Sequence, residues 1–258
     1  MPAPCVHPSA VIGRTAELSD GVVVGPFAVL EDGIAIGPDA VIEMGAVLRR
    51  GTRVGAGARI GPYAVIGSPP MDARFRGEPS FVAIGARADL REHATVHRAT
   101  GEGATTRIGA DVLVMTGAHV SHNAVVGDGA VLTTHVQLGG HVEVGAGAVL
   151  GAGVMMHQWT RVGRWAMVGA TSAANTDLLP FALARGNPAR HFRLNAVGLR
   201  RHGVAQTTMS ALQNALRCLR RRDRDALAAL AAATPEVAEL VAFVDASQRG
   251  VARFVTGG

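Results

Sequence analysis

Five histidines lie in the middle of the chain: His119, His122, His135, His141 and His157. Neutral imidazole is well suited to accept a proton near neutral pH, and it is also a common metal ligand. The group therefore predicts one of two chemistries. One histidine acts as a general base while others bind a substrate, or several bind a metal. Either chemistry depends on the elements that bring these residues together.

An aliphatic residue returns at every sixth position from Ile12 to Val168, with two interruptions and no change of phase. Gly often follows it, and a small residue often precedes it by two positions, as in Ala28-Val29-Leu30. A period of six does not fit an amphipathic helix, and the strands of a β-sandwich would drift in phase. The pattern predicts a mainly β fold: a parallel β-helix in which three hexads make one triangular coil of about 18 residues.

The two interruptions, residues 67–82 and 98–107, are predicted loops. Insertions in solenoid proteins are extruded on one side, which is often the binding side. His122 and His141 are 19 residues apart, and His141 and His157 are 16 apart, so each pair is separated by roughly one coil. The spacing predicts a row of histidines along one edge of the prism, beside the loops.

The hexads stop near residue 190, and helical spacing follows. Met209, Leu212, Leu216 and Leu219 fall on one helix face, and Thr234-Pro235 has the residue types of a helix start. We therefore expect two domains: residues 1–190 form the β-helix, with loops at 67–82 and 98–107, and residues 191–258 form a small C-terminal α-helical domain.

Arginine supplies all of the basic charge, because the chain contains no lysine. Ten arginines lie between residues 185 and 224, where Asp223 is the one acidic residue. This region is either a solvated face or a dock for an acidic protein or a phosphorylated small molecule. Nucleic acid is not expected, because aromatic residues are few and no recognised nucleic-acid module is present.

Neither a transmembrane segment nor a signal peptide is expected from the sequence. The two cysteines, Cys5 and Cys218, lie far apart and outside any metal-ligand pattern. We therefore expect a cytoplasmic protein without disulfides.

Several segments of the chain form a recognisable set in their order and spacing: Gly77-Glu78-Pro79, Val96-His97-Arg98, Gly117 to Asn123, Leu138 to His141, Val154 to Gln158, Ala184 to Pro188, Asn195, and Gly198 to Arg201. Together they resemble the acyl-carrier-protein–UDP-N-acetylglucosamine O-acyltransferase family, the hexapeptide-repeat acyltransferases that begin lipid A synthesis. The resemblance spans essentially the whole chain. It implies a left-handed β-helix and a homotrimer with active sites in the clefts between prisms. It also implies transfer of a 3-hydroxyacyl chain from acyl carrier protein to the sugar 3-hydroxyl, with no metal or cofactor.

The resemblance also implies roles for individual residues. His122 falls on the general base, and Gly140 falls on the backbone N–H that stabilises the oxyanion. Ala170 falls near the position that measures acyl length, where a methyl group suggests a medium-length chain. The substrate-binding positions are Asp72, Arg74, His119, His141, His157, Gln158, Asn195 and Arg201.

Four residues depart from the family pattern. Asn123 replaces an Asp after the catalytic His, Met71 a Gln, Val197 a Glu and His202 an Arg. They leave several readings open: a slower O-acyltransferase, a non-catalytic paralogue, or N-acyltransfer to a 3-amino UDP-sugar, whose amine asks less of the base. Two more distant alternatives are a hexapeptide metalloenzyme of the carbonic anhydrase type and the glucosamine N-acyltransferase of the same pathway. The latter enzyme has a separate N-terminal domain, whereas the hexads here begin near residue 10.

Overall fold

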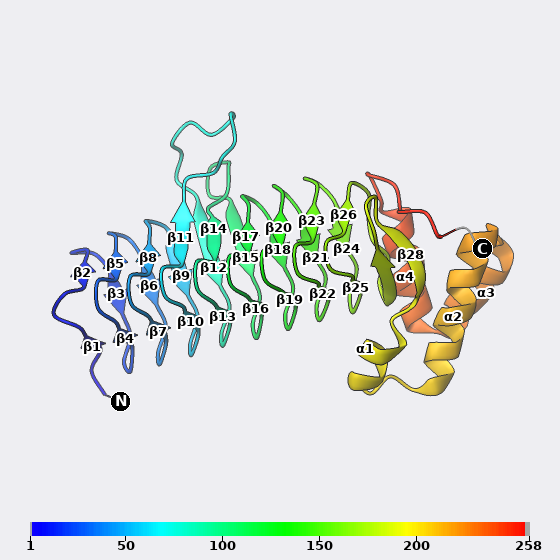
Figure 1. Ribbon diagram of the computed structural model, residues 1–258, viewed down its shortest axis with the longest axis horizontal. Helices are drawn as coiled ribbons and strands as arrows, with labels where there is room; N and C mark the ends of the chain where they lie inside the picture. Colours follow the sequence, from blue (N-terminus) through cyan, green and yellow to red (C-terminus); the bar gives the residue numbers. More distant parts are fainter. Residues whose placement is uncertain (1, 256–258) are drawn as a thin grey trace.

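The chain forms a three-sided prism of short strands with a helical unit at its C-terminal end (Figure 1). The computed structural model describes residues 2–255, and within them it has 28 strands and four helices. The strands make three sheets in which every third strand pairs with parallel register. This is a left-handed parallel β-helix: the hexads predicted the parallel β-helix, and the family resemblance implied its left-handed coil.

Each sheet forms one side of the prism. Sheet A contains β1 (Cys5–Val6), β4 (Val23–Val24), β7 (Val41–Ile42), β10 (Arg59–Ile60), β13 (Asp89–Leu90), β16 (Leu113–Val114), β19 (Val131–Leu132), β22 (Val149–Leu150), β25 (Met167–Val168), β27 (Ala182–Arg185) and β28 (Arg190–Leu194). Sheet B contains β2 (Val11–Ile12), β5 (Val29–Leu30), β8 (Val47–Leu48), β11 (Val65–Ser68), β14 (Thr95–His97), β17 (His119–Val120), β20 (Gln137–Leu138), β23 (Met155–Met156) and β26 (Ala173–Ala174). Sheet C contains β3 (Glu17–Leu18), β6 (Ala35–Ile36), β9 (Thr52–Val54), β12 (Phe81–Ile84), β15 (Thr105–Ile108), β18 (Val125–Val126), β21 (Glu143–Val144) and β24 (Arg161–Val162).

The core is a column of the residues that the hexads place inward. In the coil that contains Leu30, both Leu30 and Ala28 are fully buried, and the same pair of positions is buried in most other coils. The second residue of each two-residue strand points inward, and the residue two positions earlier lines the corner. Because successive coils pair in register, the aliphatic side chains stack directly on one another and exclude water from the axis.

Both predicted loops leave the prism at the corner between sheets B and C. The first joins β11 to β12 through residues 69–80 and projects well beyond the prism (Figure 1). The second joins β14 to β15 through residues 98–104. The hexad phase resumes after each loop because β12 and β15 pair with β9 and β18 in sheet C.

The prism ends in an antiparallel hairpin and a group of helices. Strands β27 and β28 form the hairpin, so the expected boundary at residue 190 falls on its second strand. The helices are α1 (Ala196–Arg201), α2 (Gln206–Arg221), α3 (Arg224–Ala233) and α4 (Pro235–Asp245). Met209, Leu212 and Leu216 are buried on α2, and Thr234-Pro235 begins α4, as predicted. No helix within residues 2–255 is long and apolar enough to cross a bilayer.

The helical unit is joined to the prism by polar contacts as well as by its apolar core. Arg161 on β24 binds Asp177 through its guanidinium and also donates to the carbonyl of Phe243 on α4. Arg164 forms a salt bridge with Glu239 of α4 at 2.7 Å. The chain after α4 returns to the prism, where Val251 and Phe254 make isolated bridges with Asp177 and His191. Residues 191–255 are therefore fastened to the last coils.

His191 gives this junction a dependence on pH. It is fully buried; its Nε2 accepts from the N–H of Leu179 at 2.9 Å, so its Nδ1–H donates to the carbonyl of Ala252 at 2.9 Å. Burial lowers the pKa of His191 from 6.5 to about 4. The unfolded chain therefore takes up a proton at a higher pH than the folded chain does. The stability contributed by the neutral ring is complete above the unfolded pKa and is lost as pH falls from there toward 4.

We expect the free energy of unfolding to fall by on the order of 2 kcal/mol between pH 7 and pH 5 through His191 alone. Calorimetric melting temperatures of the wild type and His191→Gln, measured at both pH values, check this. The pH dependence should be flatter in His191→Gln than in the wild type and in His135→Gln, which changes an exposed histidine. Equal slopes in all three proteins would contradict it.

Candidate active site

His122 lies in the turn between β17 and β18, at the corner of sheets B and C from which both loops emerge. Its side chain is 7% exposed. The next residue, Asn123, has a left-handed backbone (φ 60°), which Asn tolerates better than most residues. Its N–H donates to the hydroxyl of Thr106 in the preceding coil at 2.8 Å. The turn is thus held by the coil beneath it, and the imidazole is presented beside the loops.

The side chain of Asn123 determines which nitrogen of His122 carries the proton. Its Oδ1 accepts from the N–H of Thr100 at 2.9 Å, and its Nδ2 donates to the carbonyl of Thr100 at 3.0 Å. This pairing directs the amide oxygen toward Nδ1 of His122, 2.9 Å away. Because that oxygen can only accept, Nδ1 must carry the proton. Nε2 is therefore left with its lone pair free, as a general base requires.

Gly140, in the turn one coil further on, lies against this free edge of the ring. A Cβ atom at residue 140 would lie 2.5 Å from both Cε1 and Nε2 of His122. Only glycine leaves room for the imidazole there. The nitrogen that would accept a proton and the backbone of Gly140 are consequently neighbours, which is the arrangement predicted for a base and an oxyanion donor.

The turn geometry leaves the N–H of Gly140 available. Within residues 2–255 this N–H has no hydrogen-bond partner. The same turn position is occupied by Pro26, Pro38 and Pro62 in other coils, so the fold does not need an N–H there. Where the position does have a partner, it is a carboxylate: the N–H of Arg50 donates to Glu31 and that of Ala110 to Asp128. This N–H is thus suited to a negatively charged oxygen.

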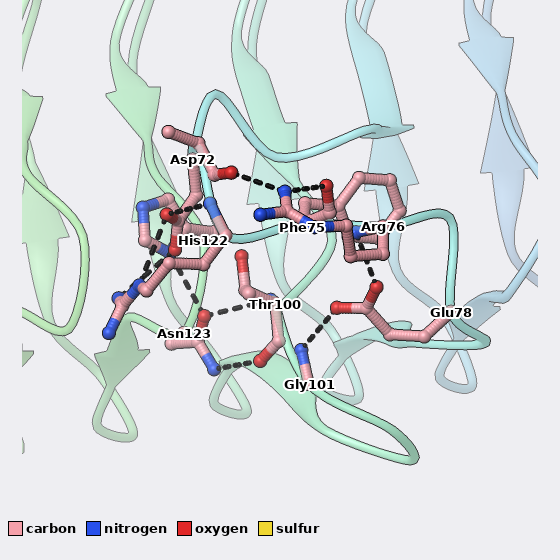
Figure 2. A network of polar contacts seen from close by, with 10 residues as sticks. Asp72, Phe75, Arg76, Glu78, Thr100, Gly101, His122 and Asn123 are labelled. Atoms are coloured by element: carbon pink, nitrogen blue, oxygen red, sulfur yellow. Dashed lines mark hydrogen bonds and ion pairs between the residues drawn. The ribbon is translucent and has the colours of Figure 1, made fainter.

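The first loop brings Asp72 to the other side of the ring (Figure 2). Its Oδ2 lies 3.9 Å from Nδ1 of His122. Hydrogen bonds from the side chain and backbone of Arg74 hold the pKa of Asp72 well below its usual range, so the carboxylate is charged. Asp72 is half-buried and Arg74 is exposed. A negative charge is therefore available near the base although Asn123 is neutral.

His141 continues the row of rings along this corner. Its ring meets that of His122 edge-on, with centroids 5.3 Å apart, and stacks on Trp159 at 3.6 Å. The third ring of the row is thus Trp159 and not His157. His157 and Gln158 are exposed in the same turn as Trp159, and Nδ1 of His157 faces the guanidinium of Arg249 at 3.2 Å.

His119 lies on sheet B beside the corner. Its Nδ1 is 2.7 Å from the hydroxyl of Thr95, and its Nε2 is 3.0 Å from that of Ser121. Its ring also meets His97 edge-on at 4.8 Å. Burial, followed by the nearby His97 and His122, lowers the pKa of His119 to about 4. Burial likewise lowers the pKa values of His97 and His141. These rings are neutral near pH 7 and suited to hydrogen bonding with a substrate.

The remaining predicted residues lie on other corners of the same chain. Asn195 begins α1: its Oδ1 accepts from the N–H of Gly198, and its Nδ2 donates to the carbonyl of Trp165 at the corner of sheets C and A. Arg201, at the end of α1, is exposed. His202, the residue after Arg201, stacks on Trp165 at 4.7 Å. One prism therefore does not bring Asn195 and Arg201 to His122.

Ala170 lies on the third corner, between sheets A and B, where it is exposed. Its role in acyl length stays a prediction. Of the departures from the family pattern, Met71 and Val197 have exposed side chains.

Sequence reasoning missed three residues at this site: Thr100, which orients Asn123; Trp159, which backs His141; and His97, which packs on His119. Residue type could have identified Trp159, since it lies 18 residues after His141. Within residues 2–255 of a single chain, no group of three or more His, Cys, Asp or Glu side chains is placed to hold a metal ion.

Comparison with known proteins identifies the family. Residues 177–252 match the family model described as UDP N-acetylglucosamine O-acyltransferase, domain 2, and residues 33–68 match the bacterial transferase hexapeptide model. The acyl-[acyl-carrier-protein]–UDP-N-acetylglucosamine O-acyltransferase of Syntrophobacter fumaroxidans is 38% identical over 256 residues, covering 96% of this chain and 99% of the relative. The enzyme of the same name from Synechocystis is 39% identical over 221 residues, covering 86% of this chain and 80% of the relative.

Solved structures agree. UDP-N-acetylglucosamine acyltransferase from Campylobacter jejuni superposes with a TM-score of 0.90 at 33% identity, covering 97% of this chain and all of that one. LpxA from Acinetobacter baumannii superposes with a TM-score of 0.91 at 28% identity, covering 96% and 99%. The chain therefore belongs to the acyl-[acyl-carrier-protein]–UDP-N-acetylglucosamine O-acyltransferase family.

Proposed function

We propose that this enzyme transfers a 3-hydroxyacyl chain from acyl carrier protein to the 3-hydroxyl of UDP-N-acetylglucosamine, the first step of lipid A synthesis. Nε2 of His122 accepts the hydroxyl proton as the sugar oxygen attacks the thioester carbonyl. The N–H of Gly140 stabilises the resulting oxyanion. Its collapse expels the carrier's thiolate, which takes the proton back from the imidazolium.

One observation carries this proposal: Gly140 lies so close to His122 that a Cβ atom on it would be 2.5 Å from Nε2. Acyl transfer to a hydroxyl needs a base and an oxyanion donor on opposite sides of one new bond. The family membership supports the substrates. An intact site also argues against a non-catalytic paralogue.

The test is a mass-spectrometric assay that offers 3-hydroxyacyl carrier proteins of several chain lengths to UDP-N-acetylglucosamine. We expect a product heavier by one 3-hydroxyacyl group, bonded at the sugar 3-position, with a preference for medium chains. Absence of acyl transfer with every donor would overturn the proposal.

A homotrimer with sites between prisms is part of the proposal. His122 and Arg201 lie on different corners of one chain, with the width of sheet C between them. A single nucleotide sugar that contacts both therefore needs the cleft between two copies. Arg201 then offers the diphosphate a planar cation with several donors.

Subunit mixing tests this arrangement. His122→Ala and Arg201→Ala homotrimers should each be poorly active, but trimers assembled from equal amounts of both should recover activity. About a quarter of their clefts would combine a wild-type His122 with a wild-type Arg201. Failure to recover activity in mixed trimers, verified by mass, would place both residues in one subunit's site.

A 3-amino UDP-sugar is a second candidate acceptor, and Asn123 is the observation that favours it. A neutral amide cannot stabilise the imidazolium by charge. An amine is a stronger nucleophile than a hydroxyl, so its attack depends less on proton removal by the base. In serine-protease triads an Asp-to-Asn change costs about 10⁴ in rate, chiefly because the wrong histidine tautomer results. Here Thr100 fixes the correct tautomer, so Asn123 is expected to cost far less.

Asn123→Asp should therefore raise kcat/KM for the hydroxyl sugar by about fivefold, because a charge-assisted bond exceeds a neutral one by about 1 kcal/mol. The value for the 3-amino analogue should change by less than about threefold. Steady-state rates with both acceptors check this. Faster wild-type turnover of the hydroxyl sugar than of the amine would remove the second candidate.

The arginines of α2 and its flanks are the proposed dock for acyl carrier protein. Arg217, Arg220 and Arg221 lie near the end of α2, and within residues 2–255 none forms a salt bridge. Arg222 and Arg224 line adjoining hollows with Leu219 and Val244. An acidic protein complements this surface. We also propose a cytoplasmic location; Cys5 and Cys218 are both free.

A further inference from the structure

We propose that Glu78 is a positioning residue that sets the proton-accepting state of His122 from the first loop. This inference rests on the proposed function, in which His122 is the base. Glu78 lies in the first loop and does not itself reach the ring; its effect passes through the second loop (Figure 2).

The carboxylate of Glu78 joins the two loops. Its Oε1 accepts from the N–H of Gly101 in the second loop at 2.8 Å, and its Oε2 accepts from the N–H of Arg76 in the first loop at 2.7 Å. These bonds, that from Gly101 first, hold the pKa of Glu78 below its usual value. The carboxylate is therefore charged at neutral pH, and both of its oxygens are engaged.

The bond to Gly101 orients one particular peptide group. The N–H of Gly101 and the carbonyl of Thr100 belong to the same planar unit, so fixing one end of it fixes the other. That carbonyl accepts from Nδ2 of Asn123 at 3.0 Å. The contacts thus run in an unbroken line from Glu78, through a rigid peptide plane, to the amide of Asn123.

The orientation of this amide decides the state of the base. With Oδ1 toward His122, Nδ1 holds the proton and Nε2 is free to accept one. With the amide reversed, an N–H would face Nδ1, and the ring would carry its proton on Nε2, where it cannot act as a base. An Asp at residue 123 would present oxygen in either orientation. Because residue 123 is an asparagine, its amide is held by the N–H and the carbonyl of Thr100, and Glu78 orients the carbonyl.

A purely structural clamp is the competing explanation. Glu78 holds the first loop to the second, and the first loop carries Asp72 and Arg74. If that were its only role, its loss would weaken substrate binding and raise KM. Its effect would also be independent of residue 123.

The experiment is a double-mutant cycle with steady-state kinetics. We expect Glu78→Ala to lower kcat between about 10- and 100-fold, short of the ~10⁴ of a fully wrong tautomer, with KM for UDP-N-acetylglucosamine nearly unchanged. Glu78→Ala added to Asn123→Ala should cost nothing more. Added to Asn123→Asp it should cost less than about threefold. Additive losses in both backgrounds, or an effect confined to KM, would overturn the proposal.

A spectroscopic readout makes the result independent of activity. Nitrogen-15 shifts of labelled His122 in the unliganded enzyme should report the Nδ1–H tautomer in the wild type and a mixture in Glu78→Ala. Glu102→Ala, which changes an exposed carboxylate in the second loop, is the matched control and should match the wild type in tautomer, kcat and melting temperature. An unchanged tautomer in Glu78→Ala would also overturn the proposal. An inactive wild type would refute the proposed function, while the tautomer would still test Glu78.

Discussion

His122→Ala is expected to lower kcat/KM for acyl transfer by about 10³- to 10⁴-fold, because it removes the one base placed beside the oxyanion donor. KM for the nucleotide sugar should change little, since the neighbouring rings remain to bind it. Initial rates of product formation, followed by mass spectrometry, check the loss.

His135→Ala is the matched control for this variant. His135 is an exposed histidine on the corner of sheets A and B, at a turn position like that of His141. Its replacement should leave the rate within about twofold of the wild type, as for most surface substitutions. If His122→Ala kept a tenth of wild-type activity, another group would have to be the base.

Gly140→Ala is expected to lower kcat by about 10²- to 10³-fold, because alanine keeps the backbone N–H but displaces the general base, whose contribution is of this order. The new methyl group would overlap Nε2 and Cε1 of His122, so the imidazole must leave its position. The backbone of Gly140 is not left-handed, so alanine can adopt its conformation. The cost of the substitution therefore comes from the overlap with the imidazole. Initial rates and melting temperatures should show an enzyme that is folded but slow.

The double variant isolates the cause. In a His122→Ala background the ring that opposes the methyl group is gone. Any loss of melting temperature caused by Gly140→Ala should therefore disappear. If the stability loss persisted there, the methyl group would be clashing with something other than the imidazole.

The hexad pattern predicted the fold well because each inward position is read directly from residue type. Every coil has the same narrow core and the same tight corners. The position of a residue within the hexad was therefore enough to predict that Leu30 and its equivalents point inward. The arithmetic was less reliable at the corner. The separation of 16 predicts that His157 lies one coil from His141, but the ring that stacks on His141 is Trp159, 18 residues away. A difference of two residues in a turn changes which way a side chain points.

The loops could not be predicted in the same way, because they have no period. Their positions in the sequence indicated a binding side, and Asp72 does approach His122. The bonds from Glu78 to Gly101 and from Thr100 to Asn123 join residues 23 positions apart. No local pattern encodes such contacts. The sequence alone suggested a deficient base at Asn123; the loop backbone that orients its amide became visible only in three dimensions.

The turn position that proline occupies at several corners of the prism has a wider consequence for solenoids of this kind. Because the fold tolerates proline at this position, it does not need an N–H there. When another residue occupies the position, its N–H is free to bind a ligand, and each added coil brings further positions of this kind. New reaction centres can therefore arise by placing one proton acceptor a single rung away, without remodelling the scaffold. The repeating fold therefore offers a series of backbone hydrogen-bond donors, and in this chain His122 lies beside one of them, the N–H of Gly140.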